Sequence, residues 1–282
     1  MKLLRFGHDG LERPGILDTD GSIRDASTLV SDWRGDVLDP ENLSGLADID
    51  ISQLPVADPD VRLGPCVGHV GSFVCVGINY LDHANETGST PPPEPLIFMK
   101  STSAVSGPDD PIIIPRGSKC TDWEVELGIV IGRTARYVEE ERALDHVAGY
   151  CTVDDVSERD FQKNRCGQWV KGKSADSFGP IGPWLVTKDE IADVQNLNLW
   201  LEVNGERMQE SNTSCMIAGA ARLVSYISQF FTLRPGDIIS TGTPSGVAMG
   251  RTPPNYLKPG DRVVLEVEGL GRQTHMVVPA DA

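Results

Sequence analysis

The chain has 282 residues, of which 39% are hydrophobic, and it contains 29 glycines and 20 prolines. This composition is typical of a globular protein rich in turns and excludes fibrous and disordered classes. The formal net charge of −16 argues against nucleic acid and anionic membranes as binding partners. An acidic protein can still bind a small anion, because charged groups that line a cleft focus the local field.

The sequence favours a cytoplasmic protein with no membrane partner. No apolar run approaches the ~20 residues that a membrane-spanning helix needs. The first seven residues lack the apolar core of a signal peptide. The six cysteines are scattered without C-x-x-C spacing, which indicates reduced thiols and argues against a disulfide framework or a zinc site.

The first 65 residues have the character of a separate small unit. Residues 2–6 are predicted to form a strand, and Asp20-Gly21 between two short apolar segments is a strong hairpin signal. The residues that follow are polar and loop-like, with prolines at 55 and 59. We expect residues 1–65 to form a small N-terminal α+β domain and residues 66–282 to form a larger second domain.

Short strands and a few helices are predicted over the second domain, which we expect to be a mixed, mainly β roll or sandwich. Apolar residues at helical spacing predict one long helix over residues 213–231. Two shorter helices are predicted over 138–146 and 156–165. Strands are predicted over 72–78, 112–114, 148–153, 238–240 and 263–267, with a hairpin over 197–209 that turns at Asn204-Gly205.

The strand predicted over residues 123–132 carries two carboxylates on one face. Glu124 and Glu126 point away from the apolar side chains of Trp123, Val125, Leu127, Ile129 and Ile131. Residues i and i+2 of a strand share a face, with Cα atoms roughly 6.5–7 Å apart. Such a pair is often the solvated face of an antiparallel sheet. If it is buried, its repulsion requires a cation, and an all-oxygen site suits Mg²⁺, Mn²⁺ or Ca²⁺.

Asp154 and Asp155 follow the strand predicted over 148–153 and precede a predicted helix. One of the pair can serve as the helix N-cap, which accounts for it structurally. The other then has no structural role. Asp155 would complete a set of three carboxylates with Glu124 and Glu126, which is a suitable donor set for Mg²⁺.

Three further segments carry side chains suited to chemistry. His83 and Glu86 are spaced i, i+3, which forms either a surface ion pair or an imidazole whose tautomer and basicity are set by the carboxylate. Lys173 is either an exposed loop residue or a cation that stabilises an oxyanion. The loop 241–246 is either a turn or a nest for a carboxylate. No G-x-S-x-G, P-loop or dinucleotide fingerprint is present, which argues against serine hydrolase, kinase and dehydrogenase chemistry.

From about Phe73 to the C-terminus, these segments in this order resemble the fumarylacetoacetate hydrolase family. The resemblance is carried by residues 76–80 with His83 and Glu86, and by 98–100, 122–127, 155–162, 173–174 and 236–244. It implies a catalytic domain built as a β-roll, a homodimer, and Mg²⁺ or Mn²⁺ as cofactor. Position 123 is Trp where many members have Tyr, but it faces away from the glutamates, so we expect metal binding to be kept.

The resemblance also assigns roles to individual residues. It places the metal ligands at Glu124, Glu126 and Asp155. It makes His83 and Glu86, on a mobile lid, the catalytic pair, and Lys173 the active-site lysine. The residues that it places around the substrate are Tyr80, Lys100, Arg159, Gln162 and Thr243.

The N-terminal unit and residues 179–184 resemble a bacterial subgroup that hydrolyses 2,4-diketo-3-deoxy sugar acids and is often labelled ureidoglycolate lyase. The implied reaction is metal-dependent cleavage of a C–C bond in a 2,4-diketo acid, such as 2,4-diketo-3-deoxy-L-rhamnonate or -fuconate. The products are pyruvate and a second acid such as lactate. The alternatives are oxaloacetate decarboxylation, isomerisation of an oxo-diene-dioate at the same metal site, or a binding module without catalysis.

Overall fold

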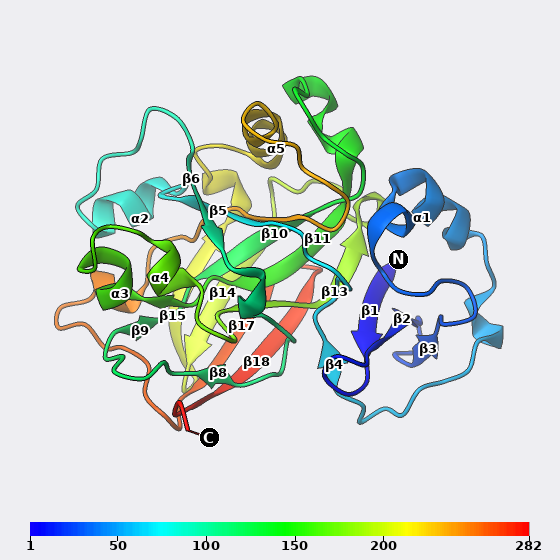
Figure 1. Cartoon of the computed structure of the whole chain (residues 1–282), viewed down its shortest axis with the longest axis horizontal. Helices are drawn as coiled ribbons and strands as arrows, with labels where there is room; N and C mark the ends of the chain where they lie inside the picture. The colour runs from blue at the N-terminus through cyan, green and yellow to red at the C-terminus, as the bar shows by residue number, and fades with distance from the viewer. Residues whose placement is uncertain (282) are drawn as a thin grey trace.

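The structure is a computed structural model that describes residues 1–281 (Figure 1). Its strands are β1 (Lys2–Phe6), β2 (Arg13–Leu17), β3 (Ile23–Asp25), β4 (Leu63–Gly64), β5 (Phe73–Gly77), β6 (Leu96–Lys100), β7 (Val105–Ser106), β8 (Ile112–Ile113), β9 (Thr121–Asp122), β10 (Val125–Ile131), β11 (Val147–Asp154), β12 (Ser157–Glu158), β13 (Gly179–Thr187), β14 (Asn198–Val203), β15 (Glu206–Asn212), β16 (Ile238–Ser240), β17 (Arg262–Val267) and β18 (Gly271–Val278).

The α-helices are short: α1 (Pro40–Ala47), α2 (Leu81–Glu86), α3 (Arg159–Lys163), α4 (Val170–Lys173) and α5 (Ala220–Ser228). The 3₁₀ helices are η1 (Gly35–Leu38), η2 (Ile51–Gln53), η3 (Thr102–Ala104), η4 (Glu140–His146), η5 (Lys188–Glu190), η6 (Thr213–Cys215) and η7 (Ala248–Gly250). The mixed, mainly β fold class expected from the sequence is confirmed. No helix within residues 1–281 combines the length and the apolar character needed to cross a bilayer.

The largest sheet holds eleven of the strands described in residues 1–281. Its main path runs β3-β2-β1-β13-β11-β10-β16-β5-β6, while β4 pairs with β1 and β7 with β13. Strands β10 and β11 lie antiparallel near the centre, with Val125 opposite Asp154. Strand β1 pairs with β13, so the N-terminal strands extend the same sheet as the rest of the chain. The domain boundary near residue 65 stays a prediction.

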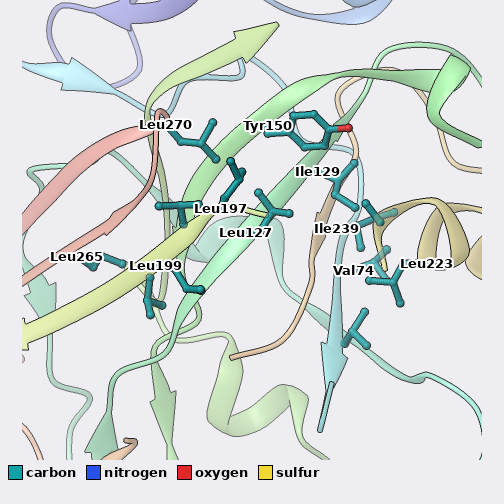
Figure 2. Packing of buried hydrophobic residues seen from close by; sticks show 14 of the residues in the cluster. Val74, Leu127, Ile129, Tyr150, Leu197, Leu199, Leu223, Ile239, Leu265 and Leu270 are labelled. Atoms are coloured by element: carbon teal, nitrogen blue, oxygen red, sulfur yellow. The ribbon is translucent and has the colours of Figure 1, made fainter. Parts of the chain in front are cut away.

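A second sheet packs against one face of the first. Its five strands within residues 1–281 run β15-β14-β17-β18-β8. The core beside it includes Leu127 of β10, Leu199 of β14, Leu265 of β17 and Leu223 of α5, all fully buried (Figure 2). The alternation predicted from residue 123 is confirmed, because every second residue from Trp123 to Ile131 belongs to this core.

The N-terminal segment covers the opposite face of the large sheet. Trp33 and Val67 pack there against Val130 of β10 and Val153 of β11. Val130 has the same strand parity as Glu126, so the two glutamates lie on this second face, nearer the start of β10. Helices α2, α3 and α4 gather beyond that end of the sheet, at the left of Figure 1.

The predicted helices are shorter in the structure. Residues 140–146 form the 3₁₀ helix η4, and residues 157–158 pair with β9, so α3 begins only at Arg159. The long helix predicted from residue 213 begins at Ala220. The segment before it is held by Asn79, whose side chain accepts a hydrogen bond from the Ala218 N–H (2.8 Å) and donates one to the Ala218 carbonyl oxygen (3.0 Å). These tertiary contacts override the helical spacing.

Both predicted hairpins are confirmed, at Asp20-Gly21 between β2 and β3 and at Asn204-Gly205 between β14 and β15. Two long strands, β13 and β18, were not predicted from the sequence. In β13, Pro180, Gly182 and Pro183 interrupt the strand pattern, although the segment pairs on both sides.

Candidate metal centre and active site

Strand register brings three carboxylates together. The Asp155 N–H donates to the Glu124 carbonyl oxygen at 2.9 Å, which continues the antiparallel pairing of β10 and β11. Because Glu126 is two residues from Glu124, all three side chains share one face. One oxygen from each of Glu124, Glu126 and Asp155 lies within 4.8 Å of the others, and none of the three residues is more than 4% exposed. The solvated-face alternative for the glutamates is therefore wrong.

Asp154 and Asp155 do not cap the helix that follows. The N-cap of α3 is Glu158, whose side chain accepts from the Asp160 N–H. Asp154 instead accepts a hydrogen bond from the Glu124 N–H at 2.9 Å, which fixes the backbone beside the cluster. Burial raises the pKa of Asp154 to about 7. The prediction that Asp154 or Asp155 serves as the N-cap of this helix is therefore wrong.

Three cations, Lys173, Arg159 and Lys100, neutralise part of the cluster. The Lys173 Nζ lies 2.7 Å from both Glu124 Oε2 and Asp155 Oδ2. The Arg159 Nη2 lies 2.6 Å from Glu124 Oε1, and its Nε donates to Asp122 at 2.8 Å. Burial tends to raise the pKa of Glu124, but the charges of Lys173 and Arg159 outweigh it and bring the pKa to about 2. Glu124 is therefore ionised at neutral pH.

Glu126 has no cationic partner. Its Oε2 accepts from the Ser240 hydroxyl (2.5 Å) and the Gly242 N–H (2.8 Å), and no Lys, Arg or His nitrogen of residues 1–281 lies within 4.0 Å. Burial, together with the charges of Asp155 and Glu124, raises the pKa of Glu126 well above its ordinary value. A cation would relieve this repulsion. The three oxygen donors, and the lack of a cation beside Glu126, fit a hard divalent ion.

The loop after β16 reaches Glu126 only because residue 242 is glycine. Gly242 has a φ of +98°, and a Cβ there would lie 2.7 Å from the Asn79 side chain and 3.0 Å from the Val76 carbonyl oxygen. Its N–H, which no Cβ crowds, is the group that donates to Glu126. Of the two alternatives for loop 241–246, a turn or a nest for a carboxylate, the contact at Gly242 fits the nest, and the carboxylate that it holds is that of Glu126.

His83 and Glu86 lie on α2, and His83 lines the same pocket as the carboxylates. The His83 Nδ1 is 3.3 Å from Glu86 Oε2, and His83 is only 7% exposed. Glu86 is itself fixed, because its Oε1 accepts from the Gly246 N–H at 2.9 Å. A carboxylate at Nδ1 orients the ring and favours the tautomer in which Nε2 can accept a proton. The surface ion-pair alternative does not describe this buried geometry.

Most of the residues predicted for the site line one pocket. They are His83, Glu124, Glu126, Asp155, Arg159, Gln162, Lys173 and Thr243. The Gln162 side chain accepts from Arg159 Nη1 at 3.1 Å, and the Thr243 hydroxyl donates to the Val125 carbonyl oxygen at 3.0 Å. Glu86 stands behind His83. Residues separated by up to 160 positions in the sequence thus share one cavity.

Lys100 and Tyr80 are not among the residues that line this pocket. The Lys100 Nζ lies 2.6 Å from Asp155 Oδ1 and donates to the carbonyl oxygens of Val156 (3.0 Å) and Lys173 (2.6 Å). Tyr80 is fully buried, and its hydroxyl has no hydrogen-bond partner within residues 1–281. The structure thus places Lys100 behind the cluster, where it supports Asp155, rather than on the pocket wall.

Other lining residues were missed by the sequence analysis. They are chiefly Thr87, Ser89, Phe98, Lys163, Trp169 and Met249. No motif marks most of them. Lys163 could have been found, because it follows Arg159 by four residues and therefore lies on the same side of α3.

The family follows from comparison with known proteins. Residues 72–278 match the fumarylacetoacetate (FAA) hydrolase C-terminal family. The chain belongs to this family. A protein of Burkholderia lata, whose name proposes a hydrolase without stating a substrate, is 57% identical over 274 residues, which cover 97% of each chain.

Solved structures of the family share the whole fold. The fumarylacetoacetate hydrolase of Exiguobacterium antarcticum is 36% identical, with a TM-score of 0.86 over 99% of both chains. A 5-carboxymethyl-2-hydroxymuconate delta-isomerase of Mycobacterium smegmatis is 33% identical, with a TM-score of 0.77 over 99% of both. The maleylpyruvate hydrolase of Sphingobium sp. SYK-6, in complex with manganese(II) and pyruvate, is 30% identical, with a TM-score of 0.81 over 99% of both.

Proposed function

We propose that this protein is a divalent-metal-dependent hydrolase that cleaves a C–C bond in a 2,4-diketo acid of the acylpyruvate type. The products are pyruvate and a second acid. The observation that carries the proposal is the buried cluster of Glu124, Glu126 and Asp155, in which Glu126 lacks a cationic partner and which lines one pocket with His83, whose ring contacts Glu86. The manganese and pyruvate in the Sphingobium enzyme support both the cofactor class and the product.

A divalent cation held by the three carboxylates would supply positive charge for the substrate's carboxylate and 2-keto oxygens. His83, oriented by Glu86, takes a proton from a water molecule, and that water attacks the C4 carbonyl carbon. The tetrahedral intermediate collapses, the C3–C4 bond breaks, and the leaving group is the enolate of pyruvate. The buried ammonium of Lys173 stabilises the enolate oxygen, and protonation at C3 gives pyruvate.

The finer parts of the proposal come from the sequence. The substrates to test first are 2,4-diketo-3-deoxy-L-rhamnonate and -fuconate, which would give pyruvate and lactate. The donor set suits Mg²⁺ or Mn²⁺. We propose a homodimer in the cytoplasm.

A second reaction at the same centre is isomerisation of an oxo-diene-dioate, which the name of the Mycobacterium smegmatis structure suggests. Oxaloacetate decarboxylation is a related alternative. Decarboxylation needs no activated water molecule, so the contact between His83 and Glu86 favours hydrolysis over decarboxylation.

The test is a screen of 2,4-diketo acids with Mg²⁺, in which pyruvate, CO₂ and enol absorbance are followed separately. We expect pyruvate release without CO₂. His83→Ala should keep its Mg²⁺ affinity and lose about 10²- to 10⁴-fold in rate, the range for a positioned base. His8→Ala, which removes an exposed histidine, is the matched control. Two results contradict the proposal: hydrolysis by His83→Ala at the wild-type rate, or release of CO₂ from the substrate.

A further inference from the structure

The pocket that holds the carboxylate cluster adjoins a second cavity of similar size. The pocket has a volume of about 70 Å³, and the second cavity, beside the proline-rich residues 92–95, has a volume of about 90 Å³. Gly77 and Ile78 line both of them. Because glycine has no side chain, Ile78 carries the only side chain of residues 1–281 that the two linings share. Ile78 therefore stands where the pocket would open into the second cavity.

The backbone of Ile78 adopts a conformation that this residue type disfavours. Its φ is +56°, in the left-handed region, which is rare for a β-branched residue because the Cβ crowds the backbone. Glycine or asparagine would make the same turn with less strain. Strained residues of this kind gather at functional sites, which points to a role for the isoleucine side chain.

The neighbours of Ile78 in the chain impose this conformation. Gly77, the last residue of β5, pairs with Leu96 of β6. On the other side, the buried side chain of Asn79 donates to the Ala218 carbonyl oxygen at 3.0 Å and accepts from the Ala218 N–H at 2.8 Å. With both neighbours fixed, the direction of the Cα–Cβ bond of Ile78 is fixed as well. Its side chain is therefore a rigid part of the pocket wall.

The pocket wall next to Ile78 is apolar. A Cβ on Gly77 would lie 2.8 Å from the Trp169 ring and 2.7 Å from the Leu96 side chain, so these groups pack closely there. The Trp169 ring meets that of Phe98 edge-on, with centroids 5.1 Å apart, and both residues line the pocket. Polar groups in a pocket fix the orientation of a ligand, and apolar walls cover the rest of it. The acyl arm of the substrate is therefore expected against this wall.

We propose that Ile78 determines specificity by closing the acyl end of the pocket, so that substrates carry a short acyl arm. A smaller residue at this position would join the pocket to the second cavity and admit a longer apolar arm. This inference rests on the proposed function and assigns to one residue the upper limit on substrate size. The two sugar-derived diketo acids, with six carbons each, have such a short arm.

The test measures binding apart from turnover. The Mg²⁺-loaded full chain is titrated calorimetrically with 2-oxohexanoate and 2-oxooctanoate, which share the 2-oxo acid group and differ by two methylenes. The wild type should bind 2-oxooctanoate no more tightly than 2-oxohexanoate. In Ile78→Gly and in Ile78→Ala the preference for 2-oxooctanoate should rise about tenfold, as expected for burial of two further methylenes. Affinity for 2-oxohexanoate should change much less.

Two control variants separate the side chain from other effects. Ile78→Asn relieves the same backbone strain but keeps a side chain with as many heavy atoms, and it should retain the wild-type preference. Ile217→Ala removes a half-exposed isoleucine that lines only the second cavity, and it should do the same. Urea unfolding of each variant confirms that it is folded.

Three results would overturn the inference. They are a wild type that already prefers 2-oxooctanoate tenfold, Ile78→Gly and Ile78→Ala with an unchanged preference, or Ile78→Asn with the same gain as Ile78→Gly. Failure of the proposed function has a different signature. In that case the preference shifts as expected in the two shortened variants, while no diketo acid releases pyruvate.

Discussion

Two buried clusters of charge in this protein are built in opposite ways. At the contact between the N-terminal segment and the rest of the chain, Arg5 pairs with Asp32 at 2.8 Å, and Arg62 pairs with Asp110 and Glu12 at 2.6 and 3.0 Å. Every carboxylate there has an arginine, so the cluster is complete by itself. In the pocket, Glu126 has no cationic partner within residues 1–281. The comparison teaches that buried charge marks a ligand site only where it is left uncompensated.

The largest effect is expected when that uncompensated charge is removed. Glu126→Gln should lower pyruvate release by about 10³-fold and metal affinity by more than about 10²-fold. The metal-free variant should be at least as stable as the wild type, because a buried repulsion is lost. Mg²⁺ titration, pyruvate assay and urea unfolding measure these effects, with the exposed Glu210→Gln as control. Retention of wild-type metal affinity would show that Glu126 is not a ligand.

Substitutions in the complete cluster around Arg5 and Arg62 should change the free energy of unfolding but not metal binding or turnover. Arg5→Met leaves Asp32 and its neighbours with a buried unpaired charge, which costs about 3–5 kcal/mol of unfolding free energy. Metal affinity and turnover of the folded protein should be unchanged. Arg116→Met breaks an exposed pair with Asp281 and should cost less than about 1 kcal/mol. A loss of metal affinity in Arg5→Met would show that the two clusters are coupled.

A variant at Lys100 tests whether this ammonium and a bound metal ion both neutralise the carboxylate of Asp155. Lys100→Met removes an ammonium 2.6 Å from Asp155 Oδ1 and should destabilise the metal-free protein by about 3 kcal/mol. Mg²⁺ should raise the melting temperature more in this variant than in the wild type, because it neutralises the same carboxylate. Lys188→Met, which loses one hydrogen bond to the Leu144 carbonyl oxygen, is the control. An equal effect of Mg²⁺ on both proteins would limit Lys100 to a packing role.

The smallest effect is a pH dependence that belongs to Glu126. The folded, metal-free protein holds a proton at Glu126 more tightly than the unfolded chain, whose carboxyl has a pKa near 4.5. This contribution to stability is present below that value and is lost as pH rises through the raised pKa, at up to about 1.4 kcal/mol per pH unit. The free energy of unfolding, measured with a chelator between pH 5 and 8, should therefore rise in Glu126→Gln relative to the wild type as the pH increases. A constant difference would mean that Glu126 ionises normally.

The sequence pattern alone was sufficient to predict those strands and turns that depend on neighbouring residues in the chain. Alternation on β10 and the turn residues at Asp20-Gly21 and Asn204-Gly205 predicted strands and hairpins that the structure confirms. Tertiary contacts decided the rest. The side chain of Asn79 holds residues ahead of α5 out of the helix, and pairing on both sides makes β13 a strand despite its prolines.

For the site, the sequence supplied the residue types but not the directions of their side chains. The three carboxylates were predictable because strand parity and the end of β11 constrain them. Lys100 sits at the end of β6 in a motif segment, yet nothing local shows that its ammonium turns toward Asp155 and two carbonyl oxygens. Which carboxylate lacks a cationic partner, as Glu126 does, depends on side chains from other elements and becomes visible only in three dimensions.

The pairing of β1 with β13 limits how the chain can be shortened. The family match begins at residue 72, which invites a truncated protein that starts near residue 66. Such a protein would lose β1 and expose the backbone edge of β13, together with the apolar face that Trp33 covers. An open strand edge recruits strands from other molecules. Aggregation of the shortened chain would then say nothing about the metal centre.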